Sequence, residues 1–155
     1  MNQPTMTNYQ RTAAWLHTCA RQKNNPAHIS TQIGVDAEEF AEWLSCLRVS
    51  QDGWAKVLER VTQDLSDLAT AIKTGKIVAH VPEHLRVDAL DALCDRDVTG
   101  NGCAYLLGFD KDAADQEVLR SNESKLQEDG TALISEGGKI MKSNRYSAPN
   151  LKGFV

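Results

Sequence analysis

In Glu38-Glu39-Phe40-Ala41-Glu42, and again in Asp88-Ala89-Leu90-Asp91-Ala92-Leu93-Cys94-Asp95, acidic residues alternate with apolar ones at the spacing of an α-helix. Each helical residue turns by about 100°, so Asp88, Asp91 and Asp95 fall within about 60° of one another. The apolar residues beside the acids are Phe40, Trp43 and Leu44 in the first stretch and Leu85, Leu90, Leu93 and Val98 in the second. Each helix must bury this apolar surface, and we expect its burial to draw the acids toward the interior.

The two acidic helix faces point to a metal site. Carboxylates that share a buried site need a counter-charge, because desolvation and mutual repulsion would otherwise protonate them. Oxygen ligands without paired His or Cys favour Mg²⁺, or Mn²⁺ as a substitute, over Zn²⁺. The alternative is a solvated helix face, since charged residues are mostly exposed. The metal site is favoured because the acids recur in two helices without the alternating Lys or Arg of a solvated face.

Composition fits one domain over residues 1–155, with a helical core over 9–123 and a basic arm over 124–155. The net charge of −4 gives no electrostatic footprint for nucleic acid. No apolar run reaches the length of a membrane span and no signal-peptide core begins the chain, so we expect a cytoplasmic protein. The cysteines have no CxxC spacing, and three lie in apolar helical patterns, which favours buried free thiols. The four cysteines are Cys19, Cys46, Cys94 and Cys103.

Periodicity and breakers predict an antiparallel bundle of about five helices. We expect them over 9–21, 30–47, 54–72, 82–107 and 110–122. Ser30 or Thr31 is expected to cap the second helix. Gly100 and Gly102 would weaken an isolated fourth helix by about 1 kcal/mol each, and a close helix crossing would justify them. The irregular arm that follows contains turns and a short strand near 132–140.

The arm is basic and complements the acidic helices. A metal-bound polyphosphate needs both, because the cation bridges phosphate oxygens while Lys and Arg neutralise the remaining charge. Asn122 and Lys125 form the best pair, since residues i and i+3 share a helix face. The candidates are Arg120, Asn122, Lys125, Lys139, Lys142 and Tyr146. The alternative is that these basic residues are merely solvated.

These elements together resemble a known family. Glu38-Glu39-x-x-Glu42 followed by Asp88-x-x-Asp91 is similar to the EExxE…ExxD pattern of MazG-like all-α nucleoside triphosphate pyrophosphohydrolases, relatives of dimeric dUTPases and phosphoribosyl-ATP pyrophosphohydrolase. The distal motifs resemble one phage and bacterial branch, over about residues 30–155. They are Asp91-Ala-Leu-Cys-Asp95, Gly108-Phe-Asp110, Glu117-Val-Leu-Arg-Ser-Asn-Glu-Ser-Lys125 and Gly137-Gly-Lys-Ile-Met-Lys142 with Tyr146 and Pro149. Asp88 stands where the family has Glu, and 46 positions separate Glu42 from Asp88.

The resemblance implies a role for each matching residue. The implied Mg²⁺ ligands are Glu39, Glu42, Asp88 and Asp91, with Asp95 in the same shell. Glu38 would orient or deprotonate the attacking water. The residues implied to contact the substrate are Asn122 and Lys125, with Lys139, Lys142 and Tyr146 closing over it.

The implied function is Mg²⁺-dependent hydrolysis of a (deoxy)nucleoside triphosphate to the monophosphate and pyrophosphate, which controls or cleans the nucleotide pool. The family assembles as homodimers or homotetramers, and the apolar helix over 54–72 would supply the interface. Two alternatives stay open. One is a non-catalytic helical interaction module with solvated acidic faces, and the other is a nucleotide sensor without turnover.

Overall fold

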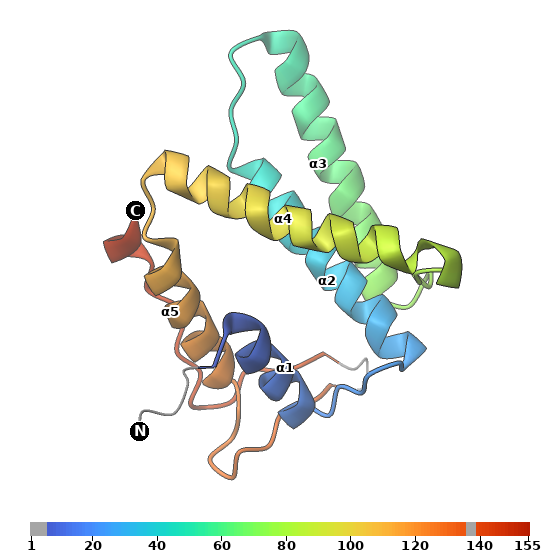
Figure 1. Cartoon of the computed structure of the whole chain (residues 1–155), viewed down its shortest axis with the longest axis vertical. Helices are drawn as coiled ribbons and strands as arrows, with labels where there is room; N and C mark the ends of the chain where they lie inside the picture. Colours follow the sequence, from blue (N-terminus) through green and yellow to red (C-terminus); the bar gives the residue numbers. More distant parts are fainter. Residues whose placement is uncertain (1–5, 136–138) are drawn as a thin grey trace. The chain divides into compact units, whose positions relative to one another are not determined.

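The computed structural model describes residues 6–135 and 139–155, and it is all-α, as the sequence predicts (Figure 1). Its α-helices are α1 (Asn8–Thr18), α2 (Pro26–Ser45), α3 (Asp52–Lys73), α4 (Arg86–Leu107) and α5 (Lys111–Glu123), and its 3₁₀ turns are η1 (Glu83–Leu85) and η2 (Lys152–Phe154). In place of the expected strand, the described part of the arm has two isolated antiparallel bridges, Leu126 with Ala132 and Ile134 with Ile140. Among the described residues, no helix is long and apolar enough to cross a membrane.

The chain divides into two compact units. One unit is Lys23–Pro82 and contains α2 and α3. The other combines Met1–Gln22 with Glu83–Val155 and contains α1, α4 and α5. The first acidic stretch therefore belongs to one unit, and the second acidic stretch and the basic arm belong to the other.

Helix α2 begins four residues before the cap expected from the sequence. Asn25 is its N-cap, and the Asn25 side-chain oxygen accepts hydrogen bonds from the backbone N–H groups of Ala27 (3.0 Å) and His28 (3.2 Å). Pro26 occupies the first helical turn, where its fixed φ and missing N–H cost nothing. The expected cap at Ser30 or Thr31 is wrong. The buried Ser30 hydroxyl instead accepts a bond from the Ala79 N–H (3.0 Å), and the Thr31 hydroxyl donates to the Ala27 carbonyl oxygen within α2 (2.9 Å).

Helices α2 and α3 pack as an antiparallel hairpin with its tightest contact at Gly34. A Cβ added to Gly34 would lie 2.8 Å from Lys73 Cγ, 3.0 Å from Ile72 Cγ2 and 3.1 Å from the Lys73 backbone nitrogen. Ala41, Ala69 and Ile72 are buried in the same hairpin. The close crossing expected at Gly100 and Gly102 is wrong, since nothing lies within 4 Å of a Cβ added at either one.

In the other unit, α1 and α5 are joined by polar side chains. Gln116 Nε2 donates to Asn8 Oδ1 (2.8 Å), and Arg11 Nη2 pairs with Glu123 Oε1 (2.7 Å). Gly108, with φ of +79°, ends α4 in the left-handed conformation that favours glycine. The Asp110 side chain then caps α5 by accepting from the Ala113 N–H (3.2 Å).

The cysteines only partly follow the sequence prediction. Cys19 is buried, but Cys46, Cys94 and Cys103 are exposed free thiols. Two of the exposed thiols, Cys94 and Cys103, lie on α4, and most of the other described residues of this helix are also exposed. Burial raises the pKa of the Cys19 thiol, and the positive charges of Arg21 and Lys125 partly oppose this shift.

Candidate functional site

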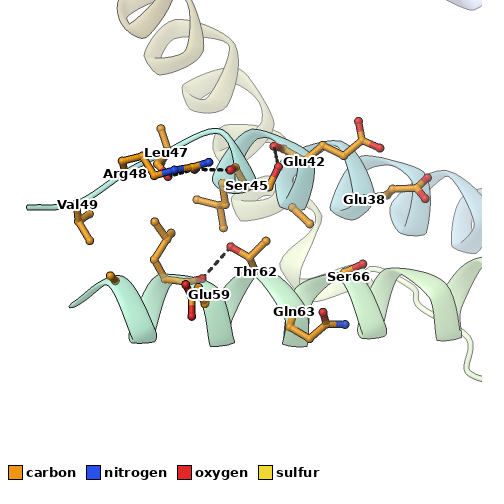
Figure 2. Close-up of a pocket in the computed structure, with 14 residues that line it drawn as sticks. Glu38, Glu42, Ser45, Leu47, Arg48, Val49, Glu59, Thr62, Gln63 and Ser66 are labelled. Carbon is orange, nitrogen blue, oxygen red and sulfur yellow. Dashed lines mark hydrogen bonds between the residues drawn. The ribbon is translucent and has the colours of Figure 1, made fainter. Parts of the chain in front are cut away.

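The acidic face of α2 opens on a groove between α2 and α3. Glu38 and Glu42 line this groove of about 670 Å³, and Glu59 of α3 lines it from the other side (Figure 2). Glu42 and Glu39 are exposed, whereas Glu38 is half-buried. The groove therefore presents carboxylate oxygens of both helices of the hairpin to solvent.

Glu38 has a partner that the sequence motif does not contain. The Lys73 ammonium group forms an ion pair with Glu38 Oε1, and the Lys73 stem crosses α2 at Gly34, one helical turn before Glu38. The absence of a side chain at Gly34 is what lets Lys73 reach along α2. Lys73 thus positions the carboxylate expected to act on water, and no spacing within the acidic motif indicates this partner.

The acids of α4 lie on an exposed surface. Asp88, Asp91 and Asp95 are exposed, and so are their apolar neighbours Leu90 (63%) and Leu93 (54%). The expectation that apolar burial draws these acids inward is therefore wrong within this unit. Within its unit, helix α4 contacts α5 and η1, and Ala104 is its one buried residue among those described.

The predicted ligands are divided between the two units. Glu38, Glu39 and Glu42 lie in one, and Asp88, Asp91 and Asp95 in the other. Within each unit, the residues described here contain no group of three or more His, Cys, Asp or Glu side chains arranged to hold a metal. Four of the predicted ligands have carboxylates with no described hydrogen bond or ion pair, so their charge is not neutralised within the two units. They are Glu42, Asp88, Asp91 and Asp95. A shared metal site stays a prediction.

The structure brings the predicted substrate residues together in two pairs. Lys125 Nζ donates to Asn122 Oδ1 (2.7 Å), and Lys142 Nζ lies 4.3 Å from the centre of the Tyr146 ring. The two pairs flank one junction, where the Ser143 hydroxyl bonds the carbonyl oxygens that follow α5 at Ser124 and Leu126. The Lys139 backbone instead bonds to Ser135: its carbonyl oxygen accepts from the Ser135 N–H (2.9 Å) and its N–H donates to the Ser135 hydroxyl (3.0 Å). Gly137 and Gly138 of the predicted motif lie outside the described residues.

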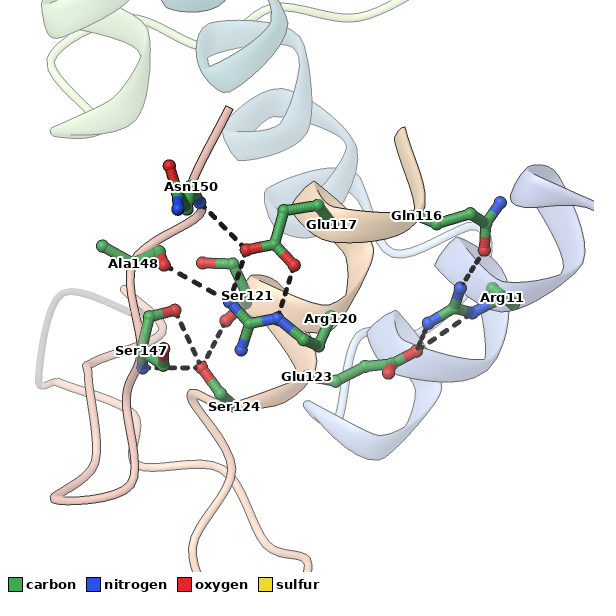
Figure 3. A network of polar contacts seen from close by, with 10 residues as sticks. All are labelled: Arg11, Gln116, Glu117, Arg120, Ser121, Glu123, Ser124, Ser147, Ala148 and Asn150. Atoms are coloured by element: carbon green, nitrogen blue, oxygen red, sulfur yellow. Dashed lines mark hydrogen bonds and ion pairs between the residues drawn. The ribbon is translucent and has the colours of Figure 1, made fainter. Parts of the chain in front are cut away.

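The last part of the arm is fastened to α5 by a polar network (Figure 3). Glu117 accepts two bonds from Arg120 (2.7 and 2.8 Å) and one from the Asn150 N–H (2.9 Å). Arg120 also donates to the Ala148 carbonyl oxygen (3.3 Å), and the Ser147 N–H donates to Ser124 Oγ (2.9 Å). The bonds from Arg120 lower the pKa of Glu117 to about 2. This network assigns Arg120 an anchoring role, not the phosphate contact that its sequence position suggests.

No protein-family model, curated protein or solved structure matches this chain. The motifs quoted above therefore carry the resemblance to MazG-like pyrophosphohydrolases by themselves. In the described part of the chain, the geometry adds Glu42 and the α4 acids, which pair with no cation, and Lys125 and Lys142, which pair with no acid.

Proposed function

We propose that the chain is a divalent-cation-dependent nucleoside triphosphate pyrophosphohydrolase of the MazG-like type. One observation carries this proposal: among the described residues, several acids and two lysines have no partner of opposite charge. Glu42 and the α4 acids have no described cationic partner, and Lys125 and Lys142 contact aromatic rings and not carboxylates. A Mg²⁺–triphosphate complex supplies the cation for the first set and the anion for the second.

Each residue has a defined part in this proposal. The carboxylates of α2 and α4 fit a hard cation, because they offer oxygen ligands; they are Glu39, Glu42, Asp88, Asp91 and Asp95. Bound Mg²⁺, or Mn²⁺ in its place, would polarise the phosphate chain and lower the pKa of a ligated water. Glu38 accepts the proton of the attacking water, with Lys73 holding its carboxylate in place. Lys125 and Lys142 stabilise charge on the phosphates as the anhydride bond breaks.

The test is a screen of deoxynucleoside and nucleoside triphosphates with Mg²⁺. We expect at least one to yield monophosphate and pyrophosphate in equal amounts, and EDTA to stop the reaction. Release of orthophosphate in place of pyrophosphate would contradict the bond proposed to break. Tight nucleotide binding without turnover would favour the sensor alternative.

Self-association is part of the proposal, and α3 is its proposed interface. Trp54, Val61 and Leu68 recur every seven residues and are 64%, 46% and 47% exposed, so they form one outward apolar stripe. An apolar groove of about 520 Å³, at the end of the hairpin where the loop joins α2 to α3, continues this stripe through Leu44 and Val49. A second copy would bury the stripe against its own. We expect light scattering to give the mass of a dimer or tetramer, and Val61→Glu to lower it to that of a monomer.

A further inference from the structure

Helix α1 lies outside the stretch that resembles the pyrophosphohydrolases, yet it contacts a residue proposed to bind phosphate. Successive contacts between α1 and α5 run in the same direction along the two chains, toward the C-terminal end of each helix. Asn8 meets Asp115 and Gln116, and Arg11 pairs with Glu123. One turn further along α1, the Trp15 ring reaches Lys125, whose ammonium nitrogen lies 5.7 Å from the ring centre.

The partners of Lys125 are neutral. Its ammonium group donates to Asn122 Oδ1 (2.7 Å) and lies over the Trp15 ring, whereas the other cations of the α1–α5 surface contact acids. Arg11 pairs with Glu123, Lys111 with Asp115 and Arg120 with Glu117. An amide oxygen and a ring face orient an ammonium group without cancelling its charge. Lys125 is therefore half-buried and held in place, and its positive charge stays available to an anion.

The indole nitrogen of Trp15 shows that core packing alone does not explain this residue. Trp15 Nε1 is buried and has no hydrogen-bond partner among the described residues. Leaving a buried N–H unpaired is destabilising, and phenylalanine would avoid it. Tryptophan has the ring that attracts a cation most strongly, so the choice fits a contact with Lys125 better than a purely structural role.

We propose that Trp15 is a positioning residue that, together with Asn122, holds the Lys125 ammonium group where it binds a phosphate oxygen of the substrate. The inference rests on the proposed function for the identity of the anion. It extends the site to α1, which no sequence motif includes. Tethering the Lys125 side chain at two points restricts its rotamers. The entropy cost of this restriction is incurred when the chain folds, so it does not reduce the affinity for the phosphate.

The experiment is a double-mutant cycle on the full chain with inorganic tripolyphosphate as the probe, measured by calorimetry. Trp15→Leu should weaken binding about two- to fivefold, and Trp15→Phe by less, with unfolding stability equal to or above wild type. In a Lys125→Met background, Trp15→Leu should have no further effect. The control is Tyr9→Leu, which removes an exposed aromatic residue from the same helix and should bind as wild type does.

A second readout does not depend on binding. Ring currents of Trp15 should shift the Lys125 ε-methylene signals in NMR spectra, and Trp15→Leu should remove this shift. The proposal would be overturned if Trp15→Leu weakened binding equally in the wild-type and Lys125→Met backgrounds. It would also be overturned by an unshifted Lys125 signal in the wild type, or by a wild type that does not bind tripolyphosphate. Coupling without nucleotide hydrolysis would instead overturn the proposed reaction and leave the positioning role intact.

Discussion

Helices α2 and α4 carry similar acidic and apolar sequences, but they pack differently within their units. Helix α2 meets α3 so closely at Gly34 that a single methyl group would not fit. Helix α4 has a bare surface at Gly100 and Gly102, and its Leu90 and Leu93 are more than half exposed. The comparison teaches that an acidic helical stripe predicts the helix, whereas the partner helix decides how deeply the stripe is buried.

The largest effect is expected from the acids, which should be equally important on both helices despite the difference in packing. Glu42→Gln on α2 and Asp91→Asn on α4 should each reduce triphosphate hydrolysis below detection. Both side chains are exposed, so we expect the free energy of unfolding to change by no more than about 0.5 kcal/mol. The matched control is Asp97→Asn, which lies on the opposite side of α4 from Asp88. Loss of activity in the Asp97→Asn control, or retained activity in Glu42→Gln or Asp91→Asn, would contradict the proposed role of these acids.

Glu38 should behave differently from its neighbours, because it is half-buried and paired with Lys73. Glu38→Gln should lower kcat by about 10²- to 10⁴-fold, while the affinity for Mn²⁺ changes little. Steady-state kinetics and metal titration on the same preparation separate the two quantities. If Glu38→Gln abolishes Mn²⁺ binding as Glu42→Gln does, Glu38 is a ligand and not the base.

The packing difference itself can be tested with glycines. Gly34→Ala should lower the free energy of unfolding by about 1–3 kcal/mol, because the new methyl group collides with Lys73 and Ile72. Gly102→Ala should raise it by about 0.5–1 kcal/mol, since nothing lies within 4 Å and alanine favours the helix. Urea denaturation measures both. A destabilised Gly102→Ala protein would show that α4 is closely covered in solution.

The smallest effect is expected at Glu117 of α5. This acid is paired with Arg120, whereas no described ion pair involves the predicted ligands of α4. Because the pKa of Glu117 falls from near 4.5 to about 2 in the folded chain, its stabilising contribution is present above pH 4.5 and disappears as the pH falls to 2. Glu117→Gln should therefore lower the melting temperature at pH 6 and have progressively less effect toward pH 2. Glu128→Gln, which removes an exposed acid from the arm, should show no such trend. A constant difference across this range would contradict the Arg120 contact.

The sequence predicts the helices well, because their apolar periodicity, Gly108 and Asp110 are local signals. It misses the α2 cap, since Asn25 caps the helix and Pro26 begins it, ahead of the expected Ser30 or Thr31. It also misses the long-range partners. Lys73 reaches Glu38 across a hairpin, and Trp15 meets Lys125 across more than 100 positions, so no spacing rule could pair them. The backbone N–H groups of Ser147 and Asn150 fasten the arm to α5, and these contacts are likewise not indicated by the arm's own sequence.

The most direct test of the central claim, that the acids of α2 and α4 serve one cation, is Mn²⁺ binding followed by electron paramagnetic resonance. Wild-type protein should bind Mn²⁺, and Glu42→Gln and Asp91→Asn should each weaken that binding. The double variant should bind no more weakly than the worse single variant, because the two carboxylates act on the same ion. Full Mn²⁺ binding in both single variants, or no binding by the wild type, would contradict a shared metal site.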